Sequence, residues 1–281
     1  MKLECRRTEG TVRGADDLRL HFQAWEATDA RAGLILVHGL ADHGGRFAPF
    51  AEWMTGIGIS SFALDLRGHG RSDGRRGHVA RFDRFLEDLD RFRSMVHHRL
   101  EPGCPLFLVG HSMGGLITIR YLQEFDPPLH GAIVTSPWLA TAHPVPTWKL
   151  TLSRPLSRLL PWLPFRAGIE ANDLSHDPAM VGAYRDDPLV HDTITPRLFV
   201  EALDAMRLAT ERKDRVRVPL LLLIAGEDRL VDSSVAHAFS QRLEGDIEFA
   251  LLDGQFHDLL NEATRDEIWT RVAAWVEARL A

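Results

Sequence analysis

The chain has 281 residues, 45% hydrophobic and 26% charged, and its formal net charge at pH 7 is −6. This composition is ordinary for a globular protein, and the mild acidity excludes the broad basic surface of a nucleic-acid-binding protein. The chain has too few cysteines for a disulfide framework, no apolar signal-peptide region at its charged N-terminus, and no apolar run long enough to cross a bilayer. We therefore expect a cytoplasmic protein with no nucleic-acid partner, whose contact with membranes is at most peripheral.

Short apolar runs alternate with helical patterns along the chain. The opening segment 18–27 alternates polar and apolar residues, which predicts antiparallel edge strands. Nearly continuous apolar runs, typical of strands buried on both faces of a parallel sheet, follow at 33–39, 59–66, 105–110, 131–136, 219–226 and 247–253. Apolar residues at helical spacing occupy 82–96 and 235–243, and a last helix is expected from Leu259 to the C-terminus. The pattern predicts an α/β fold with a doubly wound, mostly parallel sheet.

This alternation stops between 137 and 218, where no segment resembles a strand. Connections in α/β proteins are normally about 2–6 residues long. A gap of this length therefore predicts an inserted subdomain. We expect a core formed by 1–136 and 219–281, and a helical cap formed by 137–218 and inserted after the sixth strand.

Within this interval the stretch 147–165, "TWKLTLSRPLSRLLPWLPF", combines apolar side chains with cations and holds no acid. Its apolar residues fall on one helical face, and the prolines at 161 and 164 predict that the helix ends near Leu160. Two interpretations fit this face, and both can hold at once for different residues. The face is buried against the core, or it rests on lipid surfaces with the cations toward anionic headgroups.

The sharpest chemical signal is Gly110-His111-Ser112-Met113-Gly114, placed between a buried strand and an apolar helix. A serine at such a tight strand-to-helix turn takes a strained backbone conformation, which requires small residues two positions away on either side. The context predicts that Ser112 is a nucleophile.

A serine nucleophile needs a histidine base and an acid that orients it, here in the chain order serine, acid, histidine. His257 follows a strand, whereas His237 lies within a helical pattern, so His257 is the expected base. Asp228 follows the preceding strand and is the expected acid, with Asp253 as the second candidate. Asp232 is better explained as a helix N-cap.

The oxyanion hole is expected to combine the backbone amides of Met113 and Leu40, the residue after the nucleophile and one in the loop after the third strand. No histidine cluster has metal-ligand spacing, and the glycines of 67–74 are misspaced for a dinucleotide loop. We therefore predict neither a metal nor a cofactor.

With these motifs in place, the chain resembles the α/β-hydrolase superfamily, and within it the monoacylglycerol lipase and lysophospholipase branch. The resemblance rests on "LVHGLADHGGRF", "DLRGHGRSDG", "VGHSMGG", "TSPW", "GEDRLVD" and "GQFHDLLNE", in that order along the whole chain. It implies the triad Ser112, Asp228 and His257, and the oxyanion hole of Leu40 and Met113.

The resemblance also implies a headgroup end of the pocket where Asp42, His43 and Arg46 hold the hydroxyls of a glycerol. Two positions depart from the family pattern, which has a small residue at Leu40 and a second histidine at Leu260. We place Leu260 in this substrate-binding region and expect its details to differ.

The expected activity is cofactor-independent hydrolysis of monoacylglycerols or similar single-chain acyl lipids through an acyl-enzyme. The alternatives are a lysophospholipase, a general carboxylesterase, a C–C bond hydrolase or an acyltransferase, and, outside catalysis, a binding protein on the same fold. The expected partners are a small lipid-like ester and, transiently through the cap, a lipid surface. The sequence predicts neither the oligomeric state nor the acyl chain length.

Overall fold

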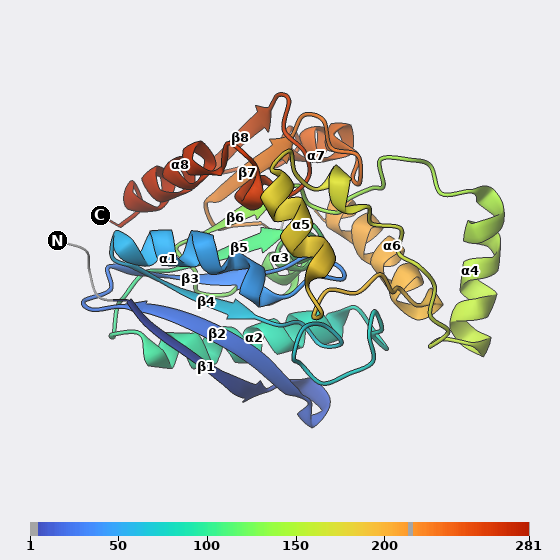
Figure 1. Ribbon diagram of the computed structural model, residues 1–281, viewed down its shortest axis with the longest axis horizontal. Helices are drawn as coiled ribbons and strands as arrows, with labels where there is room; N and C mark the ends of the chain where they lie inside the picture. Colours follow the sequence, from blue (N-terminus) through green and yellow to red (C-terminus); the bar gives the residue numbers. More distant parts are fainter. Residues whose placement is uncertain (1–4, 213–215, 281) are drawn as a thin grey trace.

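The computed structural model describes residues 5–212 and 216–280. An eight-stranded sheet runs through its centre in the order β1-β2-β4-β3-β5-β6-β7-β8 (Figure 1). The strands are β1 (Cys5–Arg13), β2 (Arg19–Ala27), β3 (Ala32–Val37), β4 (Ile59–Leu64), β5 (Leu106–His111), β6 (Gly131–Thr135), β7 (Leu220–Ala225) and β8 (Ile247–Leu252). β1 and β2 join antiparallel at one edge, and the other strands pair parallel. The predicted doubly wound, mostly parallel α/β fold is confirmed.

Both faces of the sheet are covered by helices, which is why every residue of β3 to β7 is buried. α1 (Ala48–Gly56) and α8 (Arg265–Glu277) close one apolar core. The opposite core is closed by α2 (Asp83–Arg99), α3 (Met113–Phe125), α6 (Pro196–Glu211) and α7 (Ser233–Ser240).

The prediction that the last helix begins at Leu259 is wrong. A short 3₁₀ turn covers Leu259–Asn261, and α8 begins only at Arg265. Between them the buried carboxylate of Glu262 accepts bonds from the Phe256, His176 and Ala263 amides at 2.7–2.9 Å, which holds this segment as a loop. Residue 281, at the end of the expected helix, lies outside the described residues.

The interval between β6 and β7 holds α4 (Thr147–Leu159), the 3₁₀ turn η3 (Ala171–Asp173), α5 (Pro178–Asp186) and α6. Figure 1 shows α4 at the edge of the molecule, beside α6 and on the side opposite α8. The described residues of this interval form no strand beyond isolated bridges. Residues 213–215 of the expected cap lie outside the described residues, and the division into core and cap stays a prediction.

The helix α4 ends at Leu159, as its prolines predict, but its apolar face is not buried. Its buried residues are Ser153 and Ser157, whose small side chains allow close approach to a neighbouring helix. Trp148 is 62% exposed and Leu159 75% exposed. The interpretation in which this face packs on the core is therefore wrong. No helix among the described residues is long and apolar enough to span a membrane.

Candidate active site

Ser112 lies in the turn between β5 and α3 and has the strained backbone angles φ 55° and ψ −117°. The turn leaves no room for side chains at the glycines on either side of Ser112. A Cβ on Gly114 would come within 2.1 Å of the Val37 carbonyl oxygen, and one on Gly110 within 2.4 Å of the Gly114 carbonyl oxygen. Glycine is therefore required at both positions for the chain to present the Ser112 hydroxyl at the carboxyl end of the sheet.

His257 and Asp228 meet beside this turn, in loops that follow β8 and β7. His257 Nδ1 lies 2.7 Å from Asp228 Oδ2, and both side chains are buried. Asp228 Oδ1 also accepts the amides of Leu230 and Val231 at 2.9 Å. Burial acts to raise the pKa of Asp228, but His257 and these amides outweigh it and hold the pKa below its usual value. An ionised Asp228 keeps the His257 proton on Nδ1 and leaves Nε2 as an acceptor.

Ser112 and His257 line one cavity, so the structure brings the three predicted triad residues together. The imidazole of His111 packs against that of His257, with ring centroids 4.8 Å apart. Asp253, the second candidate for the acid, is exposed, and the carboxylate at His257 Nδ1 is that of Asp228.

Gly39 and Leu40 form the cavity wall next to Ser112. A Cβ on Gly39 would lie 3.1 Å from Ser112 Cβ, so the loop after β3 passes directly over the nucleophile. Within the described ranges, the amides of Leu40 and Met113 donate to no backbone or side-chain acceptor. Both remain available to an oxyanion on the Ser112 side of the loop.

A buried charge cluster closes one end of the cavity. Arg46 lies 3.0 Å from Asp42 and 2.6 Å from Asp258, and its guanidinium stacks 4.7 Å from the Tyr184 ring centroid. Burial acts to raise the pKa of Asp258, but the positive charges of His111 and Arg46 lower it overall. Burial also lowers the pKa of His111 to about 4, so at neutral pH Arg46 is the cation that keeps Asp258 ionised.

The sequence analysis missed Asp258 and Tyr184 in this cluster. Asp258 directly follows His257, and this adjacency is a signal that was available. Tyr184 comes from α5 and carried no signal in the sequence.

Two predicted headgroup residues do not line the cavity, and we correct both. His43 Nε2 lies 2.9 Å from Asp187 and His43 Nδ1 accepts the Gly45 amide at 3.1 Å, so both ring nitrogens are occupied outside the cavity. Leu260 is 1% exposed and belongs to the apolar core closed by α1 and α8. Asp42 and Arg46 line the cavity as expected.

The cavity has a volume of about 540 Å³ and extends from Ser112 to α4. Its wall beyond the charge cluster is mostly apolar and includes Trp138, Val145, Trp148, Leu152, Leu156, Phe199, Leu230 and Val231. Among the residues that the structure describes, no group of three or more potential ligands could hold a metal ion. Ser112 thus lies in a cavity with a mostly apolar part, called the apolar tunnel below, and a charged end formed by the cluster around Arg46.

Four histidines around this site are expected to make the fold sensitive to acid. Burial lowers the pKa values of His38, His69, His111 and His191, to about 4 for the last two. In the unfolded chain these histidines bind protons near pH 6.5, whereas in the folded chain they stay neutral. Unfolding therefore takes up protons, and the free energy of unfolding falls as the pH falls from 6.5 toward 4. The free energy of unfolding should drop by about 1.4 kcal/mol per pH unit for each fully linked histidine.

Urea unfolding at pH 7.5, 6.0 and 5.0 measures this slope. His21 acts in the opposite direction, because its bond to Asp65 raises its pKa and its contribution is retained in acid. A free energy of unfolding that stays constant from pH 6.5 to 5 would contradict the neutral state of the four buried rings.

The chain is similar to known proteins over nearly its whole length. A family described as "Serine aminopeptidase, S33" matches residues 28–264. The monoacylglycerol lipase of Mycolicibacterium smegmatis is 31% identical over 98% of both chains. The human monoglyceride lipase is 32% identical over 95% of this chain and 89% of its own. The crystal structure of Paleococcus ferrophilus monoacylglycerol lipase superimposes with a TM-score of 0.83 at 28% identity, covering 99% of this chain and 100% of the other.

The family match spans most of the chain, and the two lipases align with it over nearly their full lengths. The chain therefore belongs to the serine α/β-hydrolase family that includes the monoacylglycerol lipases.

Proposed function

We propose that this enzyme hydrolyses monoacylglycerols and similar single-chain acyl esters through an acyl-enzyme on Ser112. The observation that carries the proposal is the cavity itself, in which the triad stands between an apolar tunnel and a charged end. An acyl chain fits the tunnel, and a small polar leaving alcohol fits the charged end. The lipases among the relatives support the same substrate class.

In the proposed mechanism the Ser112 hydroxyl attacks the ester carbonyl while His257 Nε2 takes its proton. Asp228 holds the imidazole and stabilises its cationic form, and the Leu40 and Met113 amides bind the oxyanion. The tetrahedral intermediate collapses as His257 returns the proton to the leaving alcohol. Water, activated by the same imidazole, then hydrolyses the acyl-enzyme and releases the fatty acid.

The charged end favours a neutral, hydroxyl-bearing headgroup. Asp42 binds the His43 amide and Arg46 through Oδ1, and no donor within the described ranges reaches its Oδ2, which is left to accept a glycerol hydroxyl. The end holds two carboxylates, Asp42 and Asp258, against the single guanidinium of Arg46, and a phosphate would be repelled there. Asp258 is bound by both Arg46 and Asn261, so among the described residues of this end Asp42 Oδ2 is the one carboxylate oxygen left for a ligand. One such oxygen suits a hydroxyl better than the α-ammonium group of an aminopeptidase substrate, which usually takes more than one acceptor, and we favour an ester.

A substrate panel tests the proposal. Monoacylglycerols, lysophospholipids, short p-nitrophenyl esters and aminoacyl p-nitroanilides are compared by kcat/KM. We expect monoacylglycerols with long chains to be best and anilides to be inert. Preference for lysophospholipids or for anilides would overturn the assignment of the charged end.

We also propose that the enzyme binds lipid surfaces peripherally and transiently through the cap. The docking surface consists of Trp148, Leu152, Leu159, Trp162, Leu163 and Phe165, of which Leu163 is the least exposed at 38%. The cations beside it include Lys149, whose ammonium lies 5.7 Å from the Trp148 ring centroid. Because Trp148 and Leu152 also line the cavity, a lipid held on this surface lies at its mouth. Tryptophan and cations together suit the boundary between headgroups and acyl chains.

Trp162→Asp should slow hydrolysis of long-chain monoacylglycerol vesicles about tenfold and leave short soluble esters unchanged. Burying such a side chain in lipid is worth about 1.5–3 kcal/mol, which the substitution forfeits. Initial rates on both substrates measure the effect.

Leu251→Asp is the matched control, because Leu251 is 46% exposed on β8, away from the docking surface. It should leave both rates unchanged. Equal slowing of vesicle and soluble substrates by Trp162→Asp would show that Trp162 supports the fold or the tunnel rather than the interface.

A further inference from the structure

His38 directly follows β3, at the start of the loop that carries Leu40, and is fully buried outside the cavity wall. Both of its ring nitrogens have partners. The Leu66 amide lies 3.0 Å from His38 Nε2, and His38 Nδ1 lies 2.7 Å from the Gly39 carbonyl oxygen. A backbone amide can only donate, so Nε2 is the acceptor and the neutral ring carries its proton on Nδ1. His38 therefore donates to the Gly39 carbonyl.

This bond has a geometric consequence for the next amide. The described chain contains no cis peptide, so the Gly39 carbonyl and the Leu40 N–H belong to one planar trans unit and point in opposite directions. Holding the carbonyl toward His38 turns the Leu40 N–H away from it. Gly39 and Leu40 line the cavity beside Ser112, and His38 does not. The Leu40 N–H, which points away from His38, thus points toward the Ser112 side of the loop, where an oxyanion would form.

The loop is held again just beyond Leu40. The His191 amide, between α5 and α6, donates to the Ala41 carbonyl at 3.0 Å. Ala41 is fully buried with φ 66°, a conformation that a non-glycine residue keeps only when its surroundings impose it. Leu40 therefore lies between two carbonyls that are each bound by a histidine, one through a side chain and one through its backbone.

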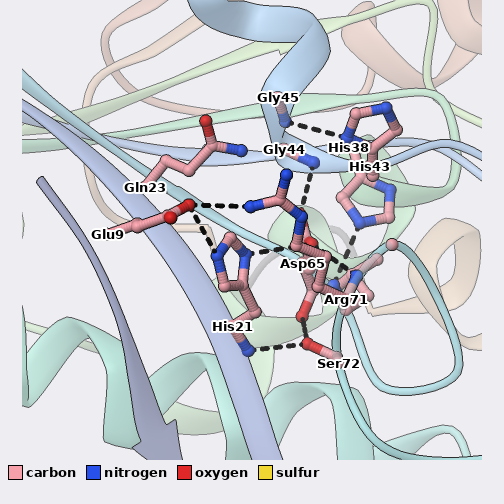
Figure 2. A network of polar contacts seen from close by, with 12 residues as sticks. Glu9, His21, Gln23, His38, His43, Gly44, Gly45, Asp65, Arg71 and Ser72 are labelled. Atoms are coloured by element: carbon pink, nitrogen blue, oxygen red, sulfur yellow. Dashed lines mark hydrogen bonds and ion pairs between the residues drawn. The ribbon is translucent and has the colours of Figure 1, made fainter. Parts of the chain in front are cut away.

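Further along, the Asp65 carboxylate accepts the Gly44 amide at 2.7 Å and the Arg71 amide at 2.8 Å. Figure 2 shows these contacts converging on Asp65 together with His21. Burial acts to raise the pKa of Asp65, but its bond to His21 and these amides lower it to about 2, so the carboxylate stays ionised. The loop from His38 to Gly44 is thus fixed at both ends, and the His38 ring sets its first peptide.

We infer that His38 is a positioning residue for ester hydrolysis, whose Nδ1–H orients the Gly39–Leu40 peptide so that the Leu40 amide binds the oxyanion. The inference rests on the proposed function of Ser112 and adds to it a residue that touches neither substrate nor triad.

Three variants test it. His38→Leu removes the donor, and His38→Asn restores one, because an asparagine amide nitrogen occupies the position of Nδ1. His69→Leu is the matched control, since His69 is equally buried, its ring packs 5.3 Å from that of His38, and it bonds the Arg67 carbonyl rather than the loop. Loss of one oxyanion donor lowers kcat by about 10²–10³. We expect this loss for His38→Leu with little change in KM, partial recovery in His38→Asn, and kcat within a few-fold of wild type for His69→Leu.

An alkyl trifluoromethyl ketone, whose adduct with the nucleophile places an oxyanion in the hole, gives a second readout. Its inhibition constant should weaken across the His38 variants by the same factors as kcat/KM. A fall in kcat with unchanged ketone affinity, or an equal fall in His69→Leu, would overturn the inference. If wild-type enzyme neither hydrolyses esters nor binds the ketone, it is the proposed function that fails.

If His38→Leu does not fold, a measurement on the wild-type protein still tests the inference. Nitrogen NMR of the ¹⁵N-labelled protein identifies the His38 ring through its hydrogen-bond coupling to the Leu66 amide. The expected form at neutral pH carries its proton on Nδ1. A proton on Nε2 would leave the Gly39 carbonyl without its donor and would refute the inference.

Discussion

Ser112→Ala should lower kcat on monoacylglycerol by a factor of about 10⁴ or more, because the covalent route through the acyl-enzyme is lost. Only the slower attack of water, helped by the oxyanion hole, remains. Steady-state hydrolysis measures the loss, and an alkyl fluorophosphonate should label wild-type enzyme once per chain and leave the variant unlabelled.

Ser153→Ala is the matched control, since Ser153 and Ser112 are the two serines of the cavity wall. The Ser153 hydroxyl donates to the Leu150 carbonyl within α4, and its replacement should change neither labelling nor kcat by more than a few-fold. Near-wild-type activity in Ser112→Ala would end the assignment of this enzyme as one that uses Ser112 as its nucleophile.

Asp228→Asn should reduce kcat by about 10³–10⁴ while keeping the shape of the site. An asparagine amide that donates to His257 Nδ1 places the ring proton on Nε2, where it can no longer accept the Ser112 proton. The variant also loses the negative charge that stabilises the imidazolium. Activity against pH and melting temperature should be measured together, because an intact fold with low activity is the expected result.

Asp253→Asn provides the comparison, since Asp253 was the alternative acid in the sequence and is exposed in the structure. It should behave as wild type. Loss of activity in Asp253→Asn with none in Asp228→Asn would reverse the roles of the two carboxylates.

The strands and the turn around Ser112 could be predicted because their signals are local. An apolar run predicts a strand buried on both faces, and glycines two residues from a serine satisfy a steric demand within five residues of chain. Asp228 and His257 follow strands of one parallel sheet, so their proximity follows from the fold.

The orientation of side chains between distant segments could not be predicted in this way. His43 turns out of the cavity because Asp187, 144 residues away in sequence, occupies its ring nitrogen. Leu260 is carried into the core by the 3₁₀ turn that precedes α8. The helical pattern of 147–165 shows that an apolar face exists, but packing through Ser153 and Ser157 decides that it points outward.

The exposed apolar face of α4 has a consequence for how this enzyme can be engineered. Most proteins cannot reshape a substrate tunnel without disturbing a packed interior, where each lost or added methylene group costs stability. Here part of the tunnel wall, including Trp148 and Leu152, belongs to a helix whose buried side chains are two serines. Because Trp148 and Leu152 are exposed, we expect their substitution to change which acyl chains fit with little change in melting temperature. Single substitutions at these positions should therefore be enough to alter the preferred chain length.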